Sequence, residues 1–144
     1  MMILLRRSSK LGSKVIRAFT NEPASHIGVS FDGVTVYHSD AKGCRSEPIE
    51  QFYKDSEVFV RHYAVPTAAM KMRALEKLGS KYDFLGLVGF GLFLLMKKLG
   101  IRARVPLMNP KWMLCSEYAE YILLGTHNTL TPVEVMSKYE NSIR

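Results

Sequence analysis

Cys115 is the residue whose type and position best suit covalent chemistry. It stands at the front of segment 113–124, whose apolar side chains recur at helical spacing, and Gly125 follows as a C-terminal cap. A thiol in the first turn of a helix lies near unpaired backbone N–H groups and the positive end of the helix dipole. Both features favour the thiolate. The sequence therefore indicates either a nucleophilic cysteine or a buried structural one.

Two histidines upstream supply the partners that a cysteine nucleophile needs, namely a base and a group that orients the base. His26 begins one predicted strand and is the candidate base, and His38 ends the next strand and is the candidate orienting residue. Asp40, two residues along the same strand face, is the alternative for the orienting role. We interpret His62 as a strand or surface residue and His127 as a loop residue, since neither has a comparable partner.

The register of a predicted hairpin decides whether the two histidines can meet. Residues 26–31 and 34–38 alternate as strands, and Asp32-Gly33 is a turn signal. A two-residue loop would turn the histidines to opposite faces, whereas a three-residue loop pairs residue 26 with residue 38 on one face. We choose the three-residue loop, in which Gly33 takes the left-handed conformation.

The remaining pattern predicts the elements that must position these residues. Strands are expected at 2–6, 43–47 and 57–63, helices at 9–20 and 67–78 and from Pro132, and a short helical turn at 49–54. In helix 67–78 the inward face is predicted to hold Ala69, Met72 and Leu75. We therefore expect a single α+β domain over 1–144, with a small antiparallel sheet packed against helices and the nucleophile at a helix N-terminus.

The apolar run Phe84–Met96, followed by Lys97 and Lys98, permits three interpretations. It is too short to span a bilayer, which takes about 20 apolar residues. It is either a segment that enters an anionic membrane interface, a pocket for an acyl chain, or a buried core helix with glycines at close contacts. Residues 97–111 are expected to form a basic loop.

The composition limits the partners and the chemistry. The chain has 144 residues, a net charge of +7 and a pI near 9.5, which favours an anionic partner such as a membrane or a cell-wall polymer. No nucleic-acid recognition motif is visible. Two cysteines without a C-x-x-C motif predict neither a disulfide framework nor structural zinc. The residues before Arg6 are too few for a secretory signal, so we expect a cytoplasmic location, or a virion-associated or released protein if the chain is viral.

Four stretches, in this order, resemble the circularly permuted papain-fold hydrolases related to the NlpC-type peptidases. These include the YiiX/YaeF-like amidases and the lecithin:retinol acyltransferase-like enzymes. The similar stretches are Ser25-His26-Ile27-Gly28-Val29, Asp32-Gly33 with Val36-Tyr37-His38, Leu78-Gly79-Ser80-Lys81-Tyr82-Asp83, and Leu114-Cys115-Ser116-Glu117. In the permuted group the histidine strand precedes the cysteine helix, as it does in this sequence.

The resemblance implies a role for each matched residue. Cys115 would be the nucleophile, His26 the general base and acid, and His38 the orienting residue. Three further residues of the matched stretches, Tyr82, Asp83 and Ser116, would line the substrate site. The orienting residue is more often acidic in the YiiX/YaeF-like branch, whereas the acyltransferase branch has a histidine twelve residues after the first. This chain has that spacing but lacks the Asn-Cys-Glu motif that the acyltransferase branch has around its nucleophile. The sequence is therefore compatible with either branch.

The implied mechanism is acyl transfer through a thioester on Cys115, without a metal or another cofactor. The first functional expectation is an amidase or endopeptidase acting on peptides such as those of peptidoglycan. The second is a lipid-directed acyltransferase or phospholipase of the same fold. The third is a catalytically silent module that keeps the fold for binding or for virion structure.

Overall fold

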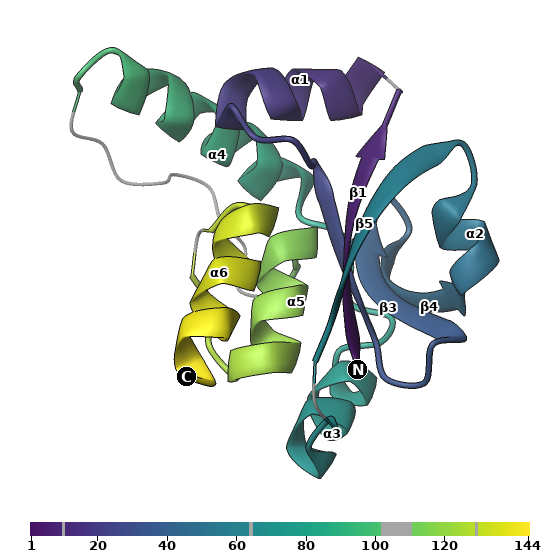
Figure 1. The fold of residues 1–144 in the computed structure, drawn as a ribbon. Helices are drawn as coiled ribbons and strands as arrows, with labels where there is room; N and C mark the ends of the chain where they lie inside the picture. Colours follow the sequence, from purple (N-terminus) through teal and green to yellow (C-terminus); the bar gives the residue numbers. More distant parts are fainter. Residues whose placement is uncertain (10, 64, 102–110, 129) are drawn as a thin grey trace.

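One antiparallel sheet organises the fold. The computed structural model describes residues 1–9, 11–63, 65–101, 111–128 and 130–144 (Figure 1). Within them five strands pair in the order β4-β3-β2-β1-β5. Their bounds are β1 Met2–Ser8, β2 His26–Ser30, β3 Thr35–Asp40, β4 Gly43–Pro48 and β5 Ser56–His62. The predicted α+β class with an antiparallel sheet is confirmed.

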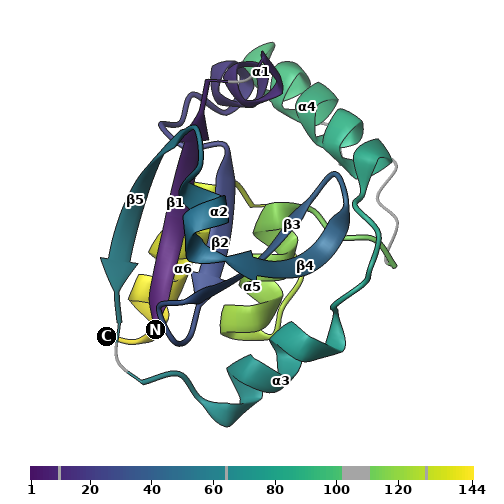
Figure 2. The same ribbon diagram turned by 90° about the vertical axis from the view of Figure 1, so that its right-hand side faces the viewer.

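Helices cover both faces of the sheet and its two ends. In the described ranges they are α1 Leu11–Thr20, α2 Ile49–Tyr53, α3 Ala68–Glu76, α4 Phe84–Lys98, α5 Cys115–Leu124 and α6 Pro132–Ser142. Helices α5 and α6 lie on one face and the short α2 on the other (Figure 1). Figure 2 shows α1 and α4 together at one end of the molecule and α3 at the opposite end.

Strand alternation divides the apolar core into two parts. Ile27 and Val29 face α5, where they are fully buried with Tyr118. Leu4 and Val36 face the other side and pack on Phe52 of α2. Any residue of β2 or β3 is therefore assigned to the α5 face or to the α2 face by its parity in the sequence.

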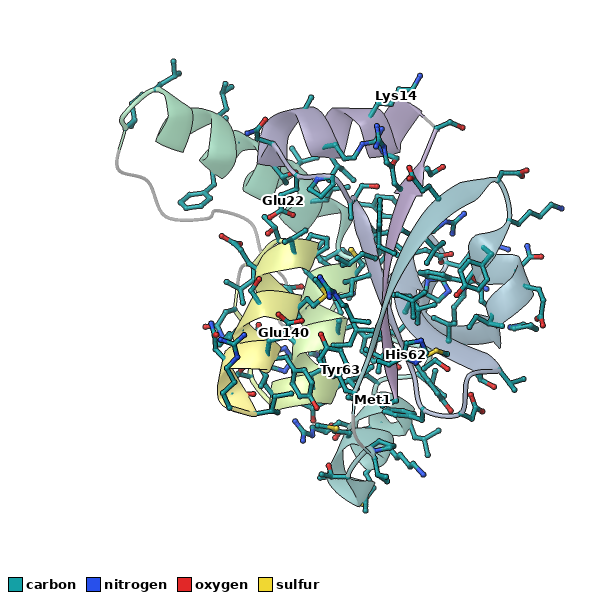
Figure 3. All side chains as sticks on the ribbon, viewed as in Figure 1. Met1, Lys14, Glu22, His62, Tyr63 and Glu140 are labelled. Carbon is teal, nitrogen blue, oxygen red and sulfur yellow. The ribbon has the colours of Figure 1, made fainter. Side chains whose placement is uncertain are left out.

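Side-chain contacts join the C-terminal helices to the sheet and to the chain around them. Tyr63, directly after β5, donates its hydroxyl to a carboxylate oxygen of Glu140 on α6, at 2.7 Å (Figure 3). Thr131 begins α6 with a capping box, since its hydroxyl accepts the Glu134 amide and the Glu134 carboxylate accepts the Thr131 amide. The predicted start of this last helix is confirmed.

The predicted hairpin register is wrong by two residues. Gly28, not His26, lies opposite His38, and pairing ends at Ser30 and Val36. The loop is longer because Asp32 Oδ1 accepts the amides of Val34 and Thr35, which keeps both residues out of the pairing with β2. A shift of two preserves the side-chain parity, so both histidines still share one face. Gly33 has the predicted left-handed conformation, with φ of +80°.

Two helices present faces that the sequence pattern did not predict. On α3, Met70 and Ala74 are buried, while the predicted inward residues Met72 and Leu75 are 71% and 57% exposed. Of the three interpretations of the apolar run, the buried core helix is wrong, because Phe84, Leu85, Val88, Leu92 and Leu95 of α4 are exposed while Gly86 and Gly89 are buried. Across the described part of the chain, no helix has the length and apolarity to cross a membrane.

Candidate active site

Cys115 is the first residue of α5, as predicted, and its side chain is almost fully buried. The helix start is fixed by three hydrogen bonds. The Glu117 carboxylate accepts the Leu114 amide at 2.8 Å, the Met113 amide donates to the Lys81 carbonyl at 3.0 Å, and Ser39 Oγ donates to the Met113 carbonyl at 2.8 Å. These bonds hold the start of α5 against β3 and against the segment that precedes α4.

The start of α5 meets the sheet at the point where β2 and β3 separate. Their pairing reaches Gly28 and His38 and stops there, although Ile27 and Ser39 would form the next pair. At this point Ser39 Oγ donates to the Met113 carbonyl, and the backbone amide of Ile27 supplies a hydrogen bond to the Cys115 thiol. The nucleophile candidate therefore lies beside the peptide bond that follows His26.

The structure brings His26 and His38 together. His26 Nε2 lies 2.9 Å from His38 Nδ1, and both rings contact Phe52, with ring centroids 5.6 Å and 5.3 Å away. The imidazoles thus face α2, whereas Cys115 belongs to the core on the α5 side. Within the described residues the thiol makes no hydrogen bond to either imidazole, so the thiol and the histidine pair are adjacent but not joined.

Glu47 on β4 is a residue of this site that the sequence interpretation missed. Its Oε1 lies 3.0 Å from His38 Nε2, and its side chain is only 5% exposed. Its other oxygen, Oε2, pairs with Arg45 at 2.7 Å, and Arg45 also holds Asp40 with two nitrogens. Asp40 is therefore engaged by Arg45, and the position next to His26 belongs to His38. Arg45 and Glu47 lie two residues apart on the predicted strand 43–47, so they share one face of it. This pair of opposite charges on one strand face was the sequence feature that could have identified Glu47.

The acceptor at Glu47 sets the tautomers of both imidazoles. An ionised carboxylate only accepts, so His38 carries its proton on Nε2, although the angle there is poor for a hydrogen bond. Nδ1 of His38 then accepts the proton of His26 Nε2. His26 Nδ1 is left with a free lone pair, which is the form that a general base requires.

Burial keeps both histidines neutral. It lowers the pKa of His26 to about 3, with His38 and Arg6 adding smaller effects in the same direction. It lowers the pKa of His38 to about 4, even though Glu47 acts in the opposite direction. Both values agree with the neutral tautomers assigned above. An imidazole that is neutral at physiological pH can accept a proton.

The thiol of Cys115 is also neutral in the free protein. Burial raises its pKa to about 11, against the amides of Ile27, Ser116 and Cys115 itself, which lower it. The expectation that the helix start would stabilise a thiolate is therefore wrong for this state, because desolvation outweighs the backbone donors. A proton must leave the thiol as the sulfur reacts.

A cavity of about 30 Å³ adjoins the thiol, which is room for about two water molecules. Its lining comes from α1, α4, α5, the start of α6 and the loops before β2, α4 and α5: Ile16, Thr20, Ser25, Tyr82, Leu87, Leu114, Cys115, Ser116 and Pro132. Tyr82 and Ser116 thus lie at the site, where we predicted them. Asp83 is buried outside this lining, and its Oδ1 accepts the Gly86 amide at 2.7 Å near the start of α4.

Neither a metal centre nor a known relative explains the site. The structure, as far as it describes the chain, contains no group of three or more His, Cys, Asp or Glu side chains placed to hold a metal ion. No model of a known protein family matches the chain, and no curated protein matches it. The functional argument therefore depends on the geometry around Cys115 and the two histidines.

Proposed function

We propose that the protein is a cysteine hydrolase of the permuted papain-like type, which cleaves amide bonds through a thioester on Cys115. One observation supports this most directly. Where β2 and β3 separate, the thiol at the start of α5 accepts the amide of Ile27, and the preceding residue, His26, has a neutral imidazole that pairs with His38. Peptides such as those of peptidoglycan are the first substrate class to test, since the basic chain suits an anionic polymer.

In the proposed reaction, His26 Nδ1 takes the thiol proton while Cys115 Sγ bonds to the amide carbon, and the carbonyl electron pair moves to oxygen. The Cys115 backbone N–H, at the start of the helix, stabilises that oxyanion. The intermediate expels the amine, which takes the proton from His26 and leaves a thioester. Water then gives a proton to His26, attacks the thioester and releases the acid, and the proton returns to the thiol.

This reaction starts from a neutral thiol and a neutral imidazole, and it needs them within hydrogen-bond reach. Catalytic hydrogen bonds are often long or poorly aligned in free enzymes and tighten when substrate binds. In this protein the hydrogen bond that must form joins Sγ of Cys115 to Nδ1 of His26. In the free protein the imidazoles face α2 and Cys115 belongs to the core on the α5 side, so His26 must turn toward the α5 side for this bond to form.

Trapping of the acyl-enzyme tests the proposal. Parent protein and Cys115→Ala are incubated with soluble peptidoglycan peptides and with N-acyl amide reporters, then quenched in acid and examined by mass spectrometry. The parent is expected to carry an acyl group on Cys115 and to release the amine, and Cys115→Ala to do neither. Cys44→Ala is the matched control, because Cys44 is also a free, buried cysteine. Equal turnover by Cys115→Ala would refute the thioester mechanism.

A second candidate is a lipid-directed acyl hydrolase or acyltransferase on the same residues. The specific observation is that Leu87 of α4 lines the cavity beside Cys115, while other apolar side chains of α4 are exposed. Acyl esters and phospholipids in the same trapping experiment separate the two candidates. Acylation of Cys115 by phospholipid but not by peptide favours the second. No acylation by any class favours the catalytically silent binding module.

A further inference from the structure

Helix α4 has an inverted distribution of side chains. Its glycines Gly86 and Gly89 are buried, so the face toward the protein body is its smallest. Its exposed face holds large apolar side chains at Phe84, Leu85, Val88, Leu92 and Leu95, each between 41% and 66% exposed. Leu99 and Ile101 continue this surface beyond the helix, at 66% and 49% exposed. A set of large apolar side chains exposed together on one element marks an interaction site.

The spacing makes these side chains one stripe. Phe84, Val88, Leu92, Leu95 and Leu99 recur at the intervals of three and four residues that align on one helix face. Helix α4 extends past the pair α5 and α6 and contacts the body through α1 (Figures 1 and 2). The stripe is therefore presented at one end of the molecule. We call it the α4 stripe.

The charge around the α4 stripe identifies the occupant. From residue 84 to residue 112 the sequence contains no Asp or Glu, and it contains Lys97, Lys98, Arg102, Arg104 and Lys111. An exposed apolar helix face in a stretch of sequence that has basic and no acidic residues matches the interface of an anionic bilayer, where acyl chains lie beneath phosphate groups. A purely apolar protein partner would not require this one-sided charge.

We propose that the α4 stripe docks on anionic lipid membranes, with α4 lying in the interfacial plane rather than crossing the bilayer. The length of the helix agrees with this, because a crossing helix takes about 20 apolar residues and α4 has 15. Docking does not require chemistry at Cys115. It would hold the cavity beside Cys115 close to the membrane surface, since Leu87 belongs to both α4 and that cavity.

Vesicle flotation tests the proposal with the whole chain and with Cys115→Ala, so that binding is measured apart from catalysis. The two vesicle types are phosphatidylcholine alone and equal parts of phosphatidylcholine and phosphatidylglycerol. We expect both proteins to float with the anionic vesicles and to be released by high salt in part. The double variant Val88→Glu, Leu92→Glu should bind about tenfold more weakly or worse, because carboxylates would have to enter the interface.

Met72→Glu is the matched control, since Met72 is an equally exposed apolar residue on α3, at the other end of the molecule. It should float like the parent, and circular dichroism should show that all variants are folded. Equal binding to both vesicle types, no binding by the parent, or equal loss in Met72→Glu would overturn the proposal. The proposal would also be overturned if the parent bound no vesicles and formed a dimer, while the double α4 variant was monomeric. The occupant of the α4 stripe would then be a second copy of the chain.

Discussion

His26 Nε2 lies 2.9 Å from His38 Nδ1, although the residue directly opposite His38 in the sheet is Gly28. The two rings are diagonal neighbours on one face, and both contact Phe52, which packs over Gly28. A Cβ at Gly28 would lie 2.6 Å from Val36 Cγ1 and 3.2 Å from the Phe52 ring. The imidazole pair therefore depends on this glycine.

Gly28→Ala should destabilise the protein by about 1–3 kcal/mol, the usual cost of overpacking a core. Val36 and Phe52 must move, and Phe52 contacts both histidines. Urea unfolding measures the change. Gly91→Ala on α4 is the matched control, since a Cβ there meets nothing within 4 Å and the helix should gain about 0.5–1 kcal/mol. Equal stability of Gly28→Ala and the parent would mean that Val36 and Phe52 pack more loosely against Gly28 than the structure shows.

The role of His38 is tested by comparing His38→Asn with His38→Ala. An asparagine carbonyl can still accept the proton of His26 Nε2 and hold the base in its tautomer, whereas alanine cannot. We expect His38→Ala to lower kcat by about 100-fold or more, and His38→Asn to recover part of that loss. KM should change little. Equal activity of the two variants would show that the side chain at this position only fills space.

The sequence predicted the elements well and their faces less well. Local signals such as Asp32-Gly33, the Thr131 cap and Gly125 after α5 identified ends and turns correctly, because each acts through neighbouring backbone groups. The hairpin register depended on how many residues Asp32 holds in its turn, which the turn signal alone does not specify. The face of α3 depended on where α5 lies, and no periodicity within α3 contains that information.

The candidate site was also predictable only in part, because local signals are visible in the sequence and contacts between distant elements are not. Cys115, His26 and His38 were predicted as the candidate site from residue type and order, and the structure pairs the two histidines but not the thiol with His26. Glu47 was missed because its partner His38 is nine residues away and on another strand. The state of the thiol was predicted wrongly because burial, which the sequence does not show, outweighs the helix start.

Glu47→Gln tests the assignment of the tautomers. A glutamine amide can donate to His38 Nε2, which would move the His38 proton to Nδ1 and reverse the bond to His26. Activity should then fall by about tenfold to 100-fold in kcat, since the base would lose its free lone pair in part of the molecules. Glu57→Gln is the control, because Glu57 forms only an exposed pair with Arg7. Unchanged activity in Glu47→Gln would place Glu47 outside the catalytic chain.

Acid should destabilise the folded protein through the histidine pair. The pKa of His26 is lowered to about 3 and that of His38 to about 4, whereas an unfolded histidine titrates near 6.5. Above pH 6.5 neither state binds the proton. Between pH 6.5 and 4 only the unfolded chain binds it, so stability falls with falling pH by about 1.4 kcal/mol per unit for each histidine.

Urea unfolding at pH 7 and pH 5 measures this loss in the parent and in the double variant His26→Gln, His38→Gln. Carboxylates titrate in both proteins, so the difference between the two slopes isolates the histidines. The double variant should lose clearly less stability on acidification, and His62→Gln, at an exposed position, should behave like the parent. Equal slopes for parent and double variant would mean that the pair is protonated or solvated in the folded state.

The thiol of Cys115 should titrate far above an ordinary cysteine in the free protein. Burial raises its pKa to about 11, so at pH 7 only about one molecule in ten thousand carries the reactive thiolate. Iodoacetamide alkylation, followed by mass spectrometry in a Cys44→Ser background, should accelerate steadily with pH beyond the midpoint near 8.5 expected for the unfolded chain. His26→Ala should not change this profile, because no hydrogen bond joins the two groups among the residues described.

Fast alkylation below pH 8 that disappears in His26→Ala would instead show a thiolate–imidazolium pair in the free protein. Proton transfer would then precede substrate binding, whereas a neutral thiol means that substrate must bring Cys115 and His26 together.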